Sequence, residues 1–105
     1  MADRNMRMTK GDTLAFGIVI ENADVELETA YFSCKANPNY TAYVFQKSLG
    51  DGITKVDDGQ YTVRVAPENT ANVDAGKYYY DLQIGANGDI FTVLKGSLYI
   101  EEGIT

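Results

Sequence analysis

The chain has 105 residues, a net charge of −6 and one cysteine, and its length fits a single domain of ordinary size. Its nine basic residues are scattered, which argues against a nucleic-acid partner because phosphate binding needs grouped Lys and Arg. One cysteine excludes an internal disulfide and fits folding in a reducing compartment. Residues 1–11 lack the apolar stretch of a signal peptide, and no apolar run is long enough to span a membrane. We therefore expect a soluble product made in the cytoplasm, with no membrane partner.

Apolar and polar residues alternate along most of the chain, and turn residues interrupt the alternation about every 8–12 positions. The first clear strand is expected over residues 14–20, after a turn at Gly11-Asp12. The shorter segment at residues 6–9 is expected to form an edge strand ahead of that turn. This spacing is typical of a β-sandwich or barrel.

The central strands are read from the same alternation. A strand over residues 30–36 has Ala30, Phe32, Cys34 and Ala36 on its inner face, and Asn37-Pro38-Asn39 ends it. A strand over residues 40–47 has apolar side chains on both faces, so its direction stays open. The segments expected next are a loop at 49–52 and two strands at 53–56 and 60–65, joined at Asp58-Gly59 by a type I′ turn.

The C-terminal third continues the pattern. Residues 66–73 are expected to form a short helical turn that crosses between sheets, and the strand at 77–84 follows with Tyr78, Tyr80, Leu82 and Ile84 inward. A type I′ turn at Asn87-Gly88 leads to the last strand, 90–100, in which we expect Gly96 to mark a bulge or bend. The whole chain, 1–105, is predicted to be one domain of about seven strands.

The segment Asp74-Ala75-Gly76-Lys77-Tyr78-Tyr79-Tyr80 resembles the corner before strand F of immunoglobulin-type domains. The resemblance places Tyr78 at the corner position, where its hydroxyl would bond to nearby backbone, and Tyr80 at the position of the family's cysteine. Cys34 lies about where the partner cysteine would fall and has nothing to pair with. We interpret it as a small buried hydrophobe, with a functional thiol as the alternative. The predicted fold class is all-β, an immunoglobulin-like antiparallel β-sandwich.

A wider resemblance covers residues 11–105. Its ordered pieces are similar to small bacteriophage and prophage structural proteins, including the N-terminal domain of phage baseplate upper proteins. That family implies a β-sandwich that docks to other virion proteins and has no active site. The pieces are Gly11-Asp12-Thr13, Leu27-Glu28-Thr29-Ala30, Phe45-Gln46-Lys47-Ser48, Ala66-Pro67-Glu68-Asn69-Thr70, Gly76-Lys77-Tyr78-Tyr79-Tyr80-Asp81-Leu82 and the tail from Phe91 to Ile100.

The sequence offers little for catalysis or metal binding. It has no histidine, which removes the commonest general base and metal ligand, and one cysteine makes a zinc site implausible. Asp51, Asp57 and Asp58 cluster around the central loops, where Asp-Gly pairs are ordinary turn chemistry, although calcium binding stays open as an alternative. We predict no catalytic residue, no cofactor and no metal, so the chain is not expected to be an enzyme.

Tyrosine is the residue in excess, with eight copies and no tryptophan. Alternation projects Tyr31 and Tyr79 outward, so they are the candidate interface residues, whereas the plain alternative is that aromatic residues suit strands. Residues 4–9 are a second candidate, as an exposed edge able to recruit another chain. The favoured function is a non-enzymatic virion structural protein of the tail, baseplate or head, a homo-oligomer made in the bacterial cytoplasm. A carbohydrate-binding module, or a hydrolase using paired carboxylates, is the alternative.

Overall fold

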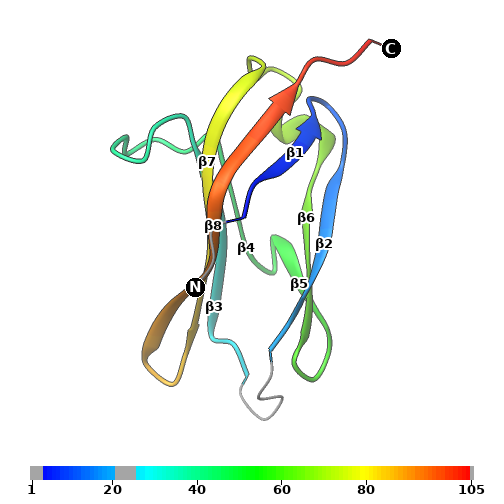
Figure 1. The fold of residues 1–105 in the computed structure, drawn as a ribbon. Helices are drawn as coiled ribbons and strands as arrows, with labels where there is room; N and C mark the ends of the chain where they lie inside the picture. The colour runs from blue at the N-terminus through cyan, green and yellow to red at the C-terminus, as the bar shows by residue number, and fades with distance from the viewer. Residues whose placement is uncertain (1–3, 21–25, 105) are drawn as a thin grey trace.

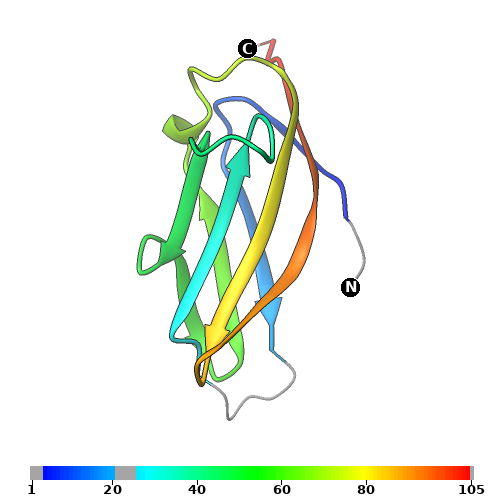
Figure 2. The same cartoon turned by 90° about the vertical axis from the view of Figure 1, so that its left-hand side faces the viewer.

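The computed structural model describes residues 4–20 and 26–104, and nearly all of its regular structure is β-strand. Within those residues the hydrogen-bonded strand order is β1-β8-β7-β3-β4-β5-β6-β2. The order folds into two facing layers, with β1, β8, β7, β3 and β4 in one and β5, β6 and β2 in the other (Figure 1, Figure 2). The elements are β1 (Met6–Thr9), β2 (Leu14–Val19), β3 (Thr29–Lys35), β4 (Phe45–Leu49), β5 (Gly52–Asp57), β6 (Gln60–Val65), η1 (Pro67–Asn69), β7 (Gly76–Ala86) and β8 (Asp89–Glu101).

The chain passes from one layer to the other in the turn between β4 and β5. Gly50 and Gly52 have φ angles of +89° and +95°, which side chains rarely adopt, and the Ser48 amide donates to the Asp51 carbonyl at 2.9 Å. A Cβ atom at Gly52 would also lie 2.9 Å from the Arg64 carbonyl oxygen. The expected loop at 49–52 is therefore a tight sheet-to-sheet crossing that needs both glycines.

The core lies between the layers and follows the predicted alternation. The inward residues of β3 and β6 are buried, as are Tyr80, Leu82 and Ile84 on β7, and Phe32 is 0% exposed. Two residues expected inside are not buried: Tyr78 at the start of β7 is only partly buried, and Ala36 is exposed because β3 ends one residue earlier. Burial raises the pKa of the Cys34 thiol to about 12, so the thiol stays protonated and packs as a small apolar group.

Two strand predictions need correction. The strand expected from residue 40 begins at Phe45, since Phe45 pairs with Cys34 and the residues before Val44 extend beyond the end of β3, where they have no strand to pair with. Eight strands form within the described residues rather than about seven, because residues 6–9 do pair. β1 runs parallel to β8, with Met6 opposite Leu98.

The two hairpin turns differ from each other. Asn87 and Gly88 have φ angles of +54° and +81°, as the predicted type I′ turn requires. At the other turn only Gly59 has a positive φ, so the type I′ prediction is wrong for Asp58-Gly59. The β5–β6 ladder shifts register between Lys55 and Asp57, and the Asp57 carboxylate accepts the Asp58 amide at 2.8 Å. The bulge and the bond from the Asp58 amide to the Asp57 carboxylate therefore form a hairpin turn that is not of type I′.

Gly96 does not mark the bulge in β8. The register shift lies between Leu82 and Gln83, whose partners are Leu94 and Thr92, so Val93 is the extra residue. Gly96 instead faces the backbone of Arg4, which a Cβ atom there would overlap. The Arg4 amide donates to the Lys95 carbonyl at 2.8 Å, so the N-terminal segment lies directly along β8.

The crossover after β6 is the predicted short helical turn, η1. Thr70, which follows it, is completely buried, and its hydroxyl oxygen accepts the Gly11 amide at 2.9 Å. This bond ties the crossover to the turn before β2. No helix within residues 4–20 and 26–104 is long and apolar enough to cross a bilayer.

The tyrosine corner is formed as expected. The Tyr78 hydroxyl donates to the Asp74 carbonyl oxygen at 2.5 Å, and burial, with Asp74 beside it, raises the pKa of the phenol. Replacing Tyr78 with phenylalanine should lower the free energy of unfolding by about 0.5–1.5 kcal/mol, the usual net value of one hydrogen bond. Urea denaturation followed by circular dichroism measures the change, and a variant as stable as the wild type would show that the bond is not structural.

Candidate functional site

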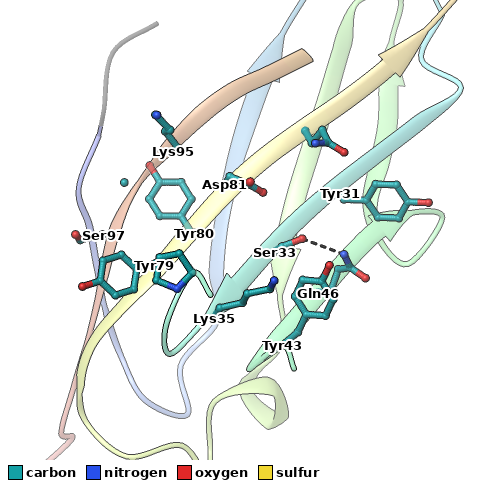
Figure 3. A pocket seen from close by; sticks show the side chains of 13 residues that line it. Tyr31, Ser33, Lys35, Tyr43, Gln46, Tyr79, Tyr80, Asp81, Lys95 and Ser97 are labelled. Atoms are coloured by element: carbon teal, nitrogen blue, oxygen red, sulfur yellow. Dashed lines mark hydrogen bonds between the residues drawn. The ribbon is translucent and has the colours of Figure 1, made fainter. Parts of the chain in front are cut away.

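The candidate site is the outer face of the layer formed by β8, β7, β3 and β4. Alternation turns one face of each strand to the core, so the residues between the core positions project outward. The strand register then sets these outward residues side by side. One row runs Gln46, Ser33, Asp81 and Lys95, and the Ser33 hydroxyl accepts a hydrogen bond from the Gln46 amide at 3.0 Å (Figure 3).

This face is hollowed into an open groove with a volume of about 830 Å³. The loop between β3 and β4 contributes to it, because Pro38 and Tyr43 are among the residues that line the groove. The lining residues are Tyr31, Ser33, Lys35, Pro38, Tyr43, Gln46, Tyr79, Tyr80, Asp81, Gln83, Lys95, Gly96 and Ser97.

Both candidate interface tyrosines lie in this groove. Tyr31 on β3 and Tyr79 on β7 are 38% and 36% exposed, so each offers part of a ring and a hydroxyl to a partner. Tyr43 was expected within the strand over residues 40–47, whose two faces are both apolar, so the direction of its side chain stayed open. The turn signal at Asn37-Pro38-Asn39, which ends four residues before Tyr43, could have indicated a loop tyrosine. Tyr40, also in that loop, is more exposed and lies outside the groove lining.

Two tyrosine rings of the groove are in contact with lysine side chains. The Lys35 ammonium lies 4.8 Å from the centre of the Tyr43 ring, and the Lys77 ammonium lies 5.3 Å from the centre of the Tyr79 ring. Such cation–π contacts hold long side chains against aromatic faces. The Tyr43 and Tyr79 rings are thereby each contacted by a lysine that projects from a strand of this layer.

Asp81 is the one carboxylate among the residues that line the groove, with Lys35 and Lys95 as the lining cations. Partial burial raises the pKa of Asp81, and the nearby Lys35 charge opposes this shift. The lining therefore carries one net positive charge on a chain whose net charge is −6. The groove supplies rings, amides and hydroxyls for contact, and a lone carboxylate does not form the pair that a glycosidase needs.

The carboxylates of the central loops lie outside the groove lining, and Asp51 and Asp58 each pair with a lysine. Lys55 lies 2.6 Å from Glu26 and 3.4 Å from Asp58, and the hydrogen bond to Glu26 raises the pKa of Lys55. Lys47 lies 3.7 Å from Asp51. Across the described ranges 4–20 and 26–104, no three His, Cys, Asp or Glu side chains come together as a metal site.

Residues 4–9, the second candidate docking surface, already pair with β8 along one of their two sides. The Ser97 amide donates to the Asn5 side chain at 3.3 Å, the Tyr80 hydroxyl donates to the Arg4 carbonyl, and Met8 is buried. Its docking role stays a prediction.

No protein-family model matches the chain, and no curated protein matches it in sequence. Solved structures that share its fold include the NK cell receptor Nkp44, at 14% identity over 98% of this chain and 100% of that one, with a TM-score of 0.54. The second Ig domain of the mouse polymeric immunoglobulin receptor matches at 11% identity over 99% of both chains, with a TM-score of 0.46. A family 123 glycoside hydrolase from Clostridium perfringens matches at 11% identity over 96% of this chain and 23% of that one, with a TM-score of 0.47. The strand order and the match to the Nkp44 receptor identify the fold of this chain as an immunoglobulin-like β-sandwich, and the similarity extends to the fold alone.

Proposed function

We propose that the chain is a non-enzymatic structural protein of a phage or prophage virion, and that it docks to another virion protein through the tyrosine groove. The observation that carries the docking role is the groove itself. It brings together the rings of Tyr31, Tyr43 and Tyr79, all partly exposed, in the lining of one groove. Tyrosine is enriched at protein interfaces because it buries a large ring while its hydroxyl keeps a hydrogen bond.

The virion assignment rests on the ordered sequence resemblance from Gly11 to the C-terminal residues. In this role the protein is made in the cytoplasm of the bacterial host and ends in the particle, at the tail, the baseplate or the head. The immunoglobulin-like fold suits the assignment, since such sandwiches present large sheet faces to partners.

The test is particle assembly with the double variant Tyr31→Ser, Tyr79→Ser. We expect the variant to fold, because both side chains lie on the outer face, and to be lost from purified particles at least about tenfold, as when an interface loses two aromatic anchors. The matched control is Tyr40→Ser, which removes a more exposed tyrosine, 56% exposed, that does not line the groove. Full incorporation of the double variant would show that the groove is not the docking surface.

A carbohydrate-binding module is the second candidate, and the composition of the same groove favours it. Partly exposed rings lie beside Asp81, Gln46 and Gln83, and sugars bind by stacking on rings while their hydroxyls bond to such polar groups. Titration of the protein with bacterial cell-wall and capsular glycans, followed by NMR shifts of the groove amides, distinguishes the two. Binding that the double serine variant abolishes would favour the module.

A further inference from the structure

The strand β2 has an open backbone edge. In the described residues it pairs only with β6, and it stands at the end of the strand order. The Ile20 amide donates to the Gly59 carbonyl at 2.7 Å, so the even-numbered residues of this segment direct their backbone groups toward β6. Ala15, Gly17 and Val19 consequently direct their amides and carbonyls away from β6, where no described residue pairs with them.

This edge carries none of the usual protection. Exposed strand edges are commonly guarded by charged residues or proline, whereas Leu14–Val19 contains neither. Val19 is 73% exposed. The strand at the other end of the order, β1, carries Arg7, which pairs with Glu101 at 3.5 Å. β2 is therefore the edge best suited to accept another strand.

The core is also incompletely covered beside β2. Leu14, Phe16 and Ile18 face the core but are only half-buried. Their partners on β6 are Val65, Val63 and Tyr61, all buried. The difference has a simple cause, since β6 has a neighbour on both sides and β2 has one. A strand added at the open edge would cover these three side chains.

Gly17, at the middle of the strand, has no explanation within its own chain. Its φ is not positive, and an added Cβ atom would meet only the Tyr61 carbonyl oxygen at an ordinary 3.8 Å. Glycine weakens a strand interior, and where it occurs another backbone often approaches closely.

We propose that the open edge pairs with β2 of a second copy of this chain, antiparallel and in a register centred on Gly17. In this register Gly17 lies opposite Gly17 of the second copy and Ala15 lies opposite Val19, so all the outward backbone groups of these residues find partners. Phe16 lies opposite Ile18 on the core side, an aromatic and β-branched pair of the kind that stabilises sheets.

The second copy is the favoured occupant because β2 is uncharged and can pair with itself. Two molecules that each carry −6 repel through most of their surfaces, and the uncharged β2 lets them meet without placing like charges opposite one another. The strand is also self-complementary, because a register centred on Gly17 pairs each outward residue with another small or apolar one. This pairing uses a different surface from the tyrosine groove and does not depend on the virion role.

The test compares Gly17→Lys with Thr62→Lys by light scattering behind a sizing column. Both residues are exposed, and they lie opposite each other on β2 and β6, so the two variants add the same charge to the same face. We expect a wild-type dimer and a retained dimer for Thr62→Lys. In Gly17→Lys two lysines would lie directly opposite each other, and the dissociation constant should rise at least about tenfold. Ala15→Pro, which removes one outward amide, should act in the same direction.

Hydrogen exchange identifies the pairing directly. The amides of Ala15, Gly17 and Val19 should gain protection as protein concentration rises, and this gain should be absent in Gly17→Lys. The double variant Tyr31→Ser, Tyr79→Ser should keep the dimer, which separates this inference from the groove. A wild-type chain that stays monomeric would leave the edge to a strand of a different protein and would overturn self-pairing. A dimer that survives Gly17→Lys, or one whose Ala15, Gly17 and Val19 amides exchange freely, would overturn it as well.

Discussion

Replacing Phe32 with alanine should lower the free energy of unfolding by about 3–5 kcal/mol, the range for deleting a large buried aromatic side chain. Phe32 is 0% exposed and touches rings from both layers. Its ring centre lies 5.3 Å from that of Phe16 on β2 and 5.8 Å from that of Phe45 on β4. The substitution therefore leaves a cavity at the place where the two sheets are held together.

Chemical denaturation followed by far-UV circular dichroism measures this loss. The matched control is Tyr31→Ala, one residue away on the same strand but on the outer face, which should change stability by less than about 1 kcal/mol. A loss below about 1 kcal/mol for Phe32→Ala would show that the ring does not occupy a close-packed core.

The sequence predicted the strand faces well because burial on one side of a sheet imposes a period of two. Phe32 and Leu82 were assigned inward from alternation alone, and the structure buries both. The corner at Tyr78 was predicted because its bond is local: the hydroxyl reaches a carbonyl only four residues back. Interactions that depend on near neighbours in the chain leave a readable signature.

Features that depend on distant segments were not predicted. Gly96 was interpreted as a bulge or bend, because a glycine within a strand can have several causes. The close approach of the Arg4 backbone is visible only in three dimensions. The strand that begins at Phe45 was predicted to begin too early, because Tyr43 and Val44 fit a strand as well as a loop. The length of β3 determines where β4 can begin to pair. The open edge of β2 follows from the strand order, which alternation does not fix.

Part of the candidate site was predicted from the sequence. Tyr31 and Tyr79 were selected because they project outward, but their meeting in one groove depends on β3 and β7 being neighbours. The role of Asp81 was missed, since a carboxylate on a strand face looks like an ordinary solvated residue. Its raised pKa comes from the surrounding groove, which no local pattern encodes.

Replacing Gly96 with alanine should lower the free energy of unfolding by about 1–3 kcal/mol, whereas Gly17→Ala should raise it by about 0.5–1 kcal/mol. Both glycines lie within strands, so propensity alone predicts a gain at each. The difference is their surroundings. A Cβ atom at Gly96 would overlap the Arg4 backbone, which cannot rotate away as a side chain could, and one at Gly17 has room.

The loss at Gly96 arises because the N-terminal segment must move off β8. Two hydrogen bonds depend on its position: the Arg4 amide to the Lys95 carbonyl, at 2.8 Å, and the Tyr80 hydroxyl to the Arg4 carbonyl. Each is worth about 0.5–1.5 kcal/mol. Denaturation at concentrations low enough to keep the chain monomeric gives both stabilities, and hydrogen exchange should show the amides of Met6–Thr9 opening faster in Gly96→Ala alone. Changes of the same sign in the two variants would mean that strand propensity, rather than the contact with Arg4, governs both sites.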